Sequence, residues 1–282
     1  MSRLLDLLLK LGKVDRRVIF LLIALAVLLP LLNPIGLTVE PTSTTIKVFK
    51  AIEAIPEGGR IMISFDYDPS SKPEMHPIAV AVLYHAFRKN LKVYMPCLWP
   101  GGPFMANDVL KLSGADEMGK VYGEDYVLLG FRPGFEAVIK GIASNIRYLY
   151  SVDASNTLID EIPMMDGIRN LKDFDFLFTV SAGYPGAIEW VQYGSDPTGI
   201  PMSSGNTSIQ VNEVIPYVNT GQMIGLIAGM PGAAEYETLL GRKGMGLAGM
   251  DAQSVAHVVI ILFIIFGNFT YYIERQRAKK RY

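Results

Sequence analysis

The sequence predicts an α/β domain, built on a mostly parallel sheet with helices on both faces and flanked by N- and C-terminal transmembrane helices. Two observations support this fold class. Long apolar runs without charge stand near both ends of the chain, and short apolar runs alternate with segments of helical spacing between them. Such alternation indicates right-handed βαβ crossovers. The short runs are apolar throughout, which fits strands that are covered on both faces.

The first long run spans residues 18–37 and holds twenty consecutive uncharged side chains. A helix rises about 1.5 Å per residue, so this run matches the roughly 30 Å apolar core of a bilayer. Pro30 and Pro34 predict a kink or the helix end in its second half. The alternative is a cleaved signal peptide, which usually has a shorter apolar region and a small-residue cleavage site. We therefore expect an uncleaved anchor.

The second long run predicts a transmembrane helix over residues 253–272, and a basic tail follows at 273–282. Arg16 and Arg17 precede the first run in the same way. Cytoplasmic flanks are enriched in Lys and Arg, so both termini are predicted to be cytoplasmic and residues 38–252 extracytoplasmic. Residues 1–17 predict an amphipathic segment, lying on the membrane surface or packed on another subunit.

The charge of the chain is divided between its parts. The 282 residues carry a net charge of −1, whereas residues 38–252 hold 16 basic and 24 acidic side chains, a net charge of −8. An acidic domain argues against nucleic acid as a partner. The single cysteine, Cys97, excludes a disulfide framework and a cysteine-cluster metal site. We expect Cys97 to be a small buried hydrophobe.

The elements between the anchors follow from the apolar periodicity and the turn residues. The predicted strands are residues 60–65, 91–98, 125–131, 175–181, 200–202 and 222–228. The predicted helices are residues 44–55, 74–90, 104–118, 134–148, 185–192, 211–217 and 231–240. Residues 149–172 are predicted to be irregular, with one short helix at 164–170. Residues 241–249 predict a glycine-rich linker, after which Asp251 would cap the second membrane helix.

A short sequence repeat, which we call the echo, lies in the second half of the domain. Ala182–Trp190 nearly repeats at Ala228–Tyr236, with six identical positions at a constant offset of 46. Each copy follows an apolar strand and opens a helix, where free N–H groups favour an anion. Open α/β sheets bind ligands at this edge, so one interpretation is a pair of loops that hold a small anionic molecule. The other is two well-made turns. The predicted ligand-binding residues are Gly183, Gly186, Gly205, Asn206, Gly229 and Gly232.

Two acidic residues follow the first predicted strand. Asp66 and Asp68, in SFDYDPSS, are the best catalytic candidates. Their spacing resembles the nucleophile motif of haloacid-dehalogenase-type phosphatases, which implies a hydrolase or transferase. No Lys and acidic pair completes that motif, so the alternative is an acidic loop after a strand. The sequence holds no P-loop, no G-x-G-x-x-G after the first strand and no G-x-S-x-G, and we expect no cofactor.

The three histidines offer a further set of interpretations. His76 could ligate a metal with Asp66 and Asp68, or be a solvated first-turn side chain. His85 is predicted to lie on the surface of its helix. His257 stands at the start of the second membrane run, where snorkelling or pairing with Asp251 is the simplest account.

Two resemblances bear on the architecture. Val214–Gly229, VIPYVNTGQMIGLIAG, resembles the helix–glycine–strand passage of periplasmic solute-binding proteins. The whole chain, with its RR-flanked anchor and its SFDYDPSSKPE, AAEYE and MDAQSVAH segments, resembles an uncharacterised prokaryotic family of two-anchor membrane proteins. That resemblance implies an extracytoplasmic Rossmann- or flavodoxin-like domain at a prokaryotic cytoplasmic (inner) membrane, and implies no activity.

The predicted function is that of a structural or interaction subunit of a membrane assembly. It rests on the missing catalytic motif, the two anchors, and polar membrane residues such as Asn33 and Asn268, whose amides need partners across helices. The expected partners are the lipid bilayer and further subunits, in a homo- or hetero-oligomer. The alternatives are a ligand-binding or sensing domain that uses the glycine loops, and a hydrolase or transferase that uses Asp66 and Asp68.

Overall fold

The computed structural model describes residues 15–37 and 39–279, so most of the predicted amphipathic segment at 1–17 lies outside the described residues. The chain divides into two compact units. One contains the residues up to Leu37 and those from Leu247 onward, and the other is the domain Thr38–Gly246.

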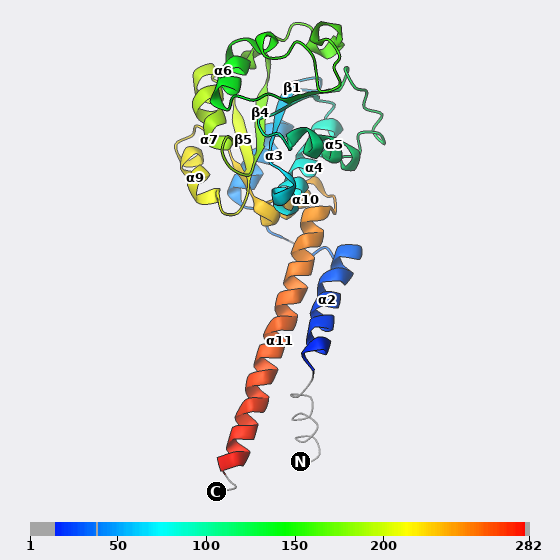
Figure 1. Ribbon diagram of the computed structural model, residues 1–282, viewed down its shortest axis with the longest axis vertical. Coiled ribbons are helices and arrows are strands. Elements are labelled where there is room, and N and C mark those ends of the chain that lie inside the picture. Colours follow the sequence, from blue (N-terminus) through cyan, green and yellow to red (C-terminus); the bar gives the residue numbers. More distant parts are fainter. Residues whose placement is uncertain (1–14, 38, 280–282) are drawn as a thin grey trace. The chain divides into compact units, whose positions relative to one another are not determined.

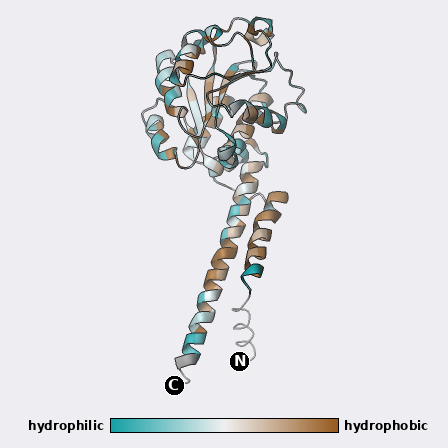
Figure 2. Ribbon diagram, in the orientation of Figure 1, coloured by the Kyte–Doolittle hydropathy of each residue, from teal (hydrophilic) through white to brown (hydrophobic). Residues whose placement is uncertain are grey.

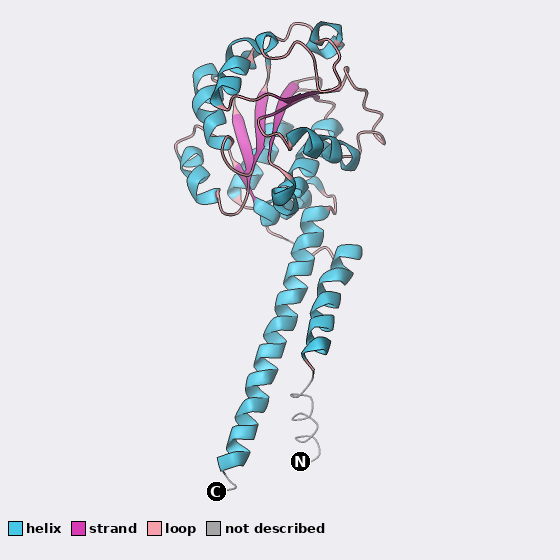
Figure 3. Cartoon of the chain, in the orientation of Figure 1, coloured by secondary structure: helices cyan, strands magenta, loops and turns pink. Residues whose placement is uncertain are grey.

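The domain is built on six strands that are all parallel to their neighbours (Figure 3). They are β1 (Arg60–Asp66), β2 (Lys92–Cys97), β3 (Tyr126–Phe131), β4 (Phe176–Ser181), β5 (Met202–Asn206) and β6 (Leu226–Ala228). The strand order is β3-β2-β1-β4-β5-β6, the order of a Rossmann fold. The prediction of an α/β domain with a parallel sheet is confirmed. From β1 the chain adds β2 and β3 on one side, and then β4, β5 and β6 on the other. The loops after β1 and β4 therefore lead away from each other.

Helices cover both faces of the sheet (Figure 1). One face carries α3 (Ser43–Glu53), α4 (Lys72–Arg88), α5 (Gly102–Leu112) and α10 (Gly229–Leu240). The other carries α6 (Glu136–Asn145), α7 (Ala187–Trp190), the π-helical turn η6 (Val191–Ser195), α8 (Asp196–Thr198) and α9 (Val211–Asn219). Side chains of β1 alternate between the two cores, Ile61, Ile63 and Phe65 on one side and Met62 on the other. Burial on both faces explains the apolar strand runs.

The fifth strand corrects the sequence prediction. We predicted residues 200–202 and a polar loop after them, but β5 runs over Met202–Asn206 and is fully buried. A Cβ on Gly205 would lie 2.5 Å from Ile78 Cγ2, so glycine lets α4 approach this strand closely. The strand was misplaced because a run of Ser, Ser, Gly and Asn lacks the apolar signal of a buried strand.

Several boundaries differ in smaller ways. The irregular segment at 149–172 contains short 3-10 turns at Ile159–Glu161, Pro163–Met165 and Leu171–Asp173 instead of one helix at 164–170. The predicted linker at 241–249 is wrong in its second half, because helix α11 already begins at Met245. Asp251 therefore lies inside the helix and does not cap its start.

The second unit contains α2 (Arg16–Leu32) and α11 (Met245–Lys279). Helix α2 ends between Pro30 and Pro34, as their positions predicted. Its 17 residues stand at the lower limit of the roughly 17–25 that a span needs. Among the described residues, one helix, Met245–Arg277, is long and apolar enough to cross a membrane. Figure 2 shows the hydrophobic stretches of both helices.

This second unit has exposed apolar side chains and one buried carboxylate. Large apolar side chains of α11 such as Ile261, Leu262 and Ile265 are more than half exposed, unlike those of a core helix. The buried carboxylate of Asp251 accepts hydrogen bonds from the backbone N–H of Gly36 (2.7 Å) and of Leu37 (3.0 Å). Asp251 thus ties the end of the first apolar run to α11.

Candidate binding site at the carboxyl edge of the sheet

Asp66 ends β1 at the point where the strand order reverses, and its side chain is fully buried. Its Oδ1 accepts from Ser64 Oγ (2.7 Å) and the N–H of Leu98 (2.9 Å). Its Oδ2 accepts from Thr179 Oγ1 (2.8 Å) and the indole N–H of Trp190 (2.9 Å). A carboxylate has about four lone-pair positions, and all four are filled here. Asp66 therefore joins β1, the loop after β2, β4 and α7, and has no free oxygen with which to attack a substrate.

The charge state of Asp66 follows from two opposing causes. Burial raises the pKa of Asp66 to about 6, and the four donors act in the opposite direction because they stabilise the ionised form. The carboxylate is therefore charged at neutral pH. A buried charge with a full set of donors is typical of a structural network.

The other predicted catalytic or metal-binding side chains are held apart from Asp66. Asp68 accepts from the N–H (3.0 Å) and Oγ (2.6 Å) of Ser70, and so caps a 3-10 turn. His76, predicted to be solvated or a ligand, is buried, and its Nδ1 lies 2.9 Å from Tyr67 Oη. Among the described residues, no three His, Cys, Asp or Glu side chains form a group that could hold a metal. The geometry thus supplies no metal centre from Asp66, Asp68 and His76.

Each of the two histidines of α4 lies between a tyrosine hydroxyl and a carboxylate. His76 Nε2 lies 3.2 Å from Asp108 Oδ2, opposite its tyrosine partner. His85, predicted to be at the surface, is also buried, between Tyr236 Oη at 2.7 Å and Glu53 Oε1 at 3.0 Å. Burial lowers the pKa of each imidazole to about 4, so both are neutral at pH 7. They link α4 to its neighbours.

The glycines predicted to bind a ligand have internal packing roles. A Cβ on Gly186 would lie 1.9 Å from Ser181 Oγ, and one on Gly183 would lie 3.2 Å from the Trp99 ring. In the second copy of the echo, a Cβ on Gly229 would lie 2.2 Å from Ser208 Oγ. A Cβ on Gly232 would lie 3.0 Å from Ile227 Cγ2. Asn206 ends β5, and its buried side chain contacts Ser204. These contacts favour well-made turns as the reason for the glycines.

The two copies of the echo are not equivalent in structure. Glu189 accepts from the N–H of Gly186 (2.7 Å), within its own loop. Glu235 instead accepts from Thr42 Oγ1 (2.7 Å) and Thr45 Oγ1 (2.6 Å), and so caps α3. The sequence similarity reflects two separate βα turns and does not create a symmetric site.

A crevice opens beside this network, where the loops after β1, β4 and β5 meet. Its volume is about 370 Å³. Its lining residues are Ser70, Ser71, Pro73, Glu74, Ala182, Thr207, Ile209 and Gln210. Ligands of open α/β sheets bind at this position, outside the carboxyl ends of strands at the reversal of strand order. The sequence identified the edge, but the lining residues Ser71, Glu74 and Gln210 were missed, because the prediction there rested on the neighbouring Asp66 and Asp68 and on the glycines.

Exposed aromatic side chains stand at the same edge of the sheet, on two βα loops and in the first turn of α5. We call Phe104, Phe135 and Tyr184 the aromatic rim; they are 65%, 55% and 60% exposed. The rings of Phe135 and Tyr184 lie 5.8 Å apart, and Tyr184 Oη donates to Glu136. Phe135 has a φ of +52°, an unfavourable value for a bulky residue. Strained backbone of this kind concentrates at functional positions.

The comparisons with known proteins are consistent in outcome: no family model and no curated protein matches this sequence. The site must therefore be interpreted from its own geometry.

Proposed function

We propose that this protein is a membrane-tethered interaction subunit, whose extracytoplasmic domain docks a second protein on the aromatic rim. The observation that carries the proposal is the exposure of Phe104, Phe135 and Tyr184 at the carboxyl edge of the sheet, Phe104 in the first turn of α5 and the other two on βα loops. Exposed aromatic side chains on neighbouring loops are typical of protein interfaces, where Tyr and Trp dominate the binding energy. The reactive side chains of this edge, above all Asp66, are occupied internally, which supports a role without catalysis.

The membrane part of the proposal rests on α11 and on the sequence. Helix α11 has the length and apolarity of a span. The uncharged run at 18–37 supplies a second anchor, and the basic flanks at Arg16, Arg17 and residues 273–282 orient both termini toward the cytoplasm. The domain is then extracytoplasmic, at a prokaryotic cytoplasmic membrane.

The charge of the domain indicates which kind of partner fits. Residues 38–252 have a net charge of −8, and carboxylates of Glu136 and Glu189 flank the rim. Two copies of this domain would repel each other, whereas a basic partner would be attracted. We therefore propose a hetero-oligomer with a basic protein that presents apolar side chains.

Site-specific photo-crosslinking in native membranes tests this function. A photoreactive phenylalanine replaces Phe135, Tyr184 or, as a matched control, Tyr148, which is 87% exposed and follows the opposite end of α6. We expect one crosslinked product of the same mass from positions 135 and 184 and none from 148. The yield of this product should fall at high salt, because salt screens the attraction between the two charged surfaces. Equal crosslinking at all three positions, or at none, would contradict the proposal.

A further inference from the structure

We infer that the crevice between the loops after β1, β4 and β5 binds a small neutral molecule rich in hydroxyl groups, such as a mono- or disaccharide. None of its lining residues belongs to the aromatic rim, and the inference does not depend on partner docking. The inference rests on the position of the crevice, on its polar groups, and on the absence of a basic side chain among its lining residues.

The polar groups of the crevice match hydroxyl groups. Glu74 Oε2 is held by the N–H (2.8 Å) and Oγ (3.1 Å) of Ser208, whereas no described residue donates to Oε1. Gln210 Oε1 accepts from Thr207 Oγ1 (3.3 Å), which leaves the amide N–H groups of Gln210 without a described partner. The hydroxyl of Ser71 is also unpaired among the described residues. One fixed acceptor, one amide donor and one hydroxyl can each bond to a sugar hydroxyl.

The apolar part of the lining completes the match. Pro73, Ala182 and Ile209 offer apolar surface to the C–H groups of a sugar ring. The volume of about 370 Å³ lies within the range of small-molecule sites. Such sites combine apolar walls with a few placed polar groups.

The charge of the lining distinguishes this ligand from an anion. The carboxylate of Glu74 faces the crevice, and the nearby ammonium of Lys72 is paired with Asp108 at 2.5 Å. An anion would therefore meet a like charge without a compensating cation. The sequence had suggested an anionic ligand from the helix N-termini alone, and the lining residues favour a neutral one.

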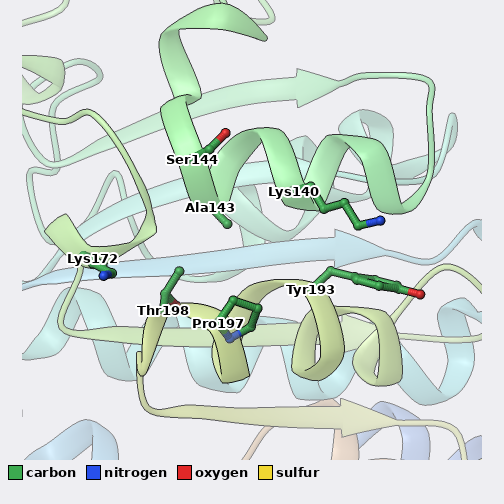
Figure 4. A pocket seen from close by; sticks show the side chains of 7 residues that line it. All are labelled: Lys140, Ala143, Ser144, Lys172, Tyr193, Pro197 and Thr198. Carbon is green, nitrogen blue, oxygen red and sulfur yellow. The ribbon is translucent and has the colours of Figure 1, made fainter.

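A second hollow of the same volume provides the control. It lies between α6 and the η6–α8 segment, and Lys140, Ser144, Lys172, Tyr193 and Thr198 line it together with Ala143 and Pro197 (Figure 4). Its lysines give it the opposite charge. Ser71→Trp would fill the crevice, and Ser144→Trp would place the same bulk in this basic hollow.

Saturation-transfer NMR on the full chain in nanodiscs tests the inference, with glucose and maltose as neutral probes, gluconate as the anion and putrescine as the cation. We expect saturable transfer to at least one sugar. Ser71→Trp should abolish it, and Ser144→Trp should leave it unchanged. Glu74→Gln keeps an acceptor beside Ser208 but removes the charge, and should weaken sugar binding about tenfold while gluconate binding improves.

Several outcomes would overturn the inference. These are no sugar binding at millimolar concentration, tighter binding of gluconate or putrescine than of either sugar, or sugar binding that survives Ser71→Trp in a folded variant. The melting temperature of each variant reports whether it folds. If Ser71→Trp does not fold, Glu74→Gln still tests the inference. Phe135→Arg should not change sugar binding, so a failure of the rim proposal is distinguishable from a failure of this one.

Discussion

At the scale of single residues, Asp66 shows how a side chain that suggests catalysis can serve the fold. Its four donors come from β1, the loop after β2, β4 and α7. In an Asp66→Asn variant, the amide N–H₂ would face two of these donors. We expect the free energy of unfolding to fall by about 2–4 kcal/mol, because buried donors lose their acceptor.

Denaturation of the solubilised full chain measures this change. Asp68→Asn is the matched control, since asparagine also caps a turn, and it should cost less than about 1 kcal/mol. If Asp66→Asn were as stable as the wild type, the carboxylate would not be the structural centre of this edge.

The buried histidines predict a dependence of stability on pH. The pKa of His76 and of His85 is lowered from 6.5 to about 4, so their contribution is complete above pH 6.5 and is lost as the pH falls toward 4. Asp66, with its pKa raised from 3.8 to about 6, acts in the opposite direction over pH 3.8–6. On unfolding at pH 5, the two imidazoles together take up nearly two protons and Asp66 releases nearly one. The net uptake is therefore about one proton.

The expected slope is about 1.4 kcal/mol of lost stability per pH unit of acidification around pH 5. Chemical denaturation at pH 7, 6 and 5 measures it. Stability that stays constant or increases toward pH 5 would show that these imidazoles are not held neutral.

At the scale of elements, the two copies of the sequence echo should respond differently to mutation. A Cβ on Gly186 would lie 1.9 Å from Ser181 Oγ and 2.3 Å from the carbonyl of Gly183, so the backbone must move. A Cβ on Gly232 would lie 3.0 Å from Ile227 Cγ2 and 3.1 Å from the backbone carbonyl carbon of Ile227, which is a milder overlap. We expect Gly186→Ala to cost more than about 2 kcal/mol, and Gly232→Ala about 1 kcal/mol or less.

Melting of the two variants in parallel makes the comparison, and each serves as the control for the other. Equal losses would mean that the copies are structurally equivalent after all. The sequence could not settle this point, because Glu189 and Glu235 occupy matching positions yet cap different elements.

The elements that the sequence predicted correctly are those with a strong apolar signal. Strands β1 to β4 were predicted to within a residue or two, because each is buried on both faces. Strand β5 was misplaced, since its burial is made possible by small side chains packed under α4. The buried state of His76 and His85 was also missed, because their tyrosine partners at positions 67 and 236 become neighbours only in the fold.

At the scale of the whole molecule, the sequence predicted a site edge but not its chemistry. The carboxyl edge followed from the glycine-rich turns after two predicted strands, whereas the crevice residues Ser71 and Glu74 follow β1 and Gln210 follows β5. No periodicity marks them, and only the folded arrangement brings them together. The aromatic rim was missed for the same reason, since Phe104, Phe135 and Tyr184 are isolated in the sequence.

The account of the molecule as an interaction subunit depends on a partner at the rim. Phe135→Arg would place a cation where we expect a basic partner and should disrupt the assembly. Tyr148→Arg, at a residue that is 87% exposed and away from the rim, adds the same charge and should have no effect.

The most direct test is native mass spectrometry of the tagged full chain, extracted gently from its own membranes. We predict a defined complex heavier than the 31.1 kDa chain by the mass of a second, basic polypeptide. That complex should persist in Tyr148→Arg and be lost in Phe135→Arg. A monomer in all three samples, or a complex that survives Phe135→Arg, would contradict the account.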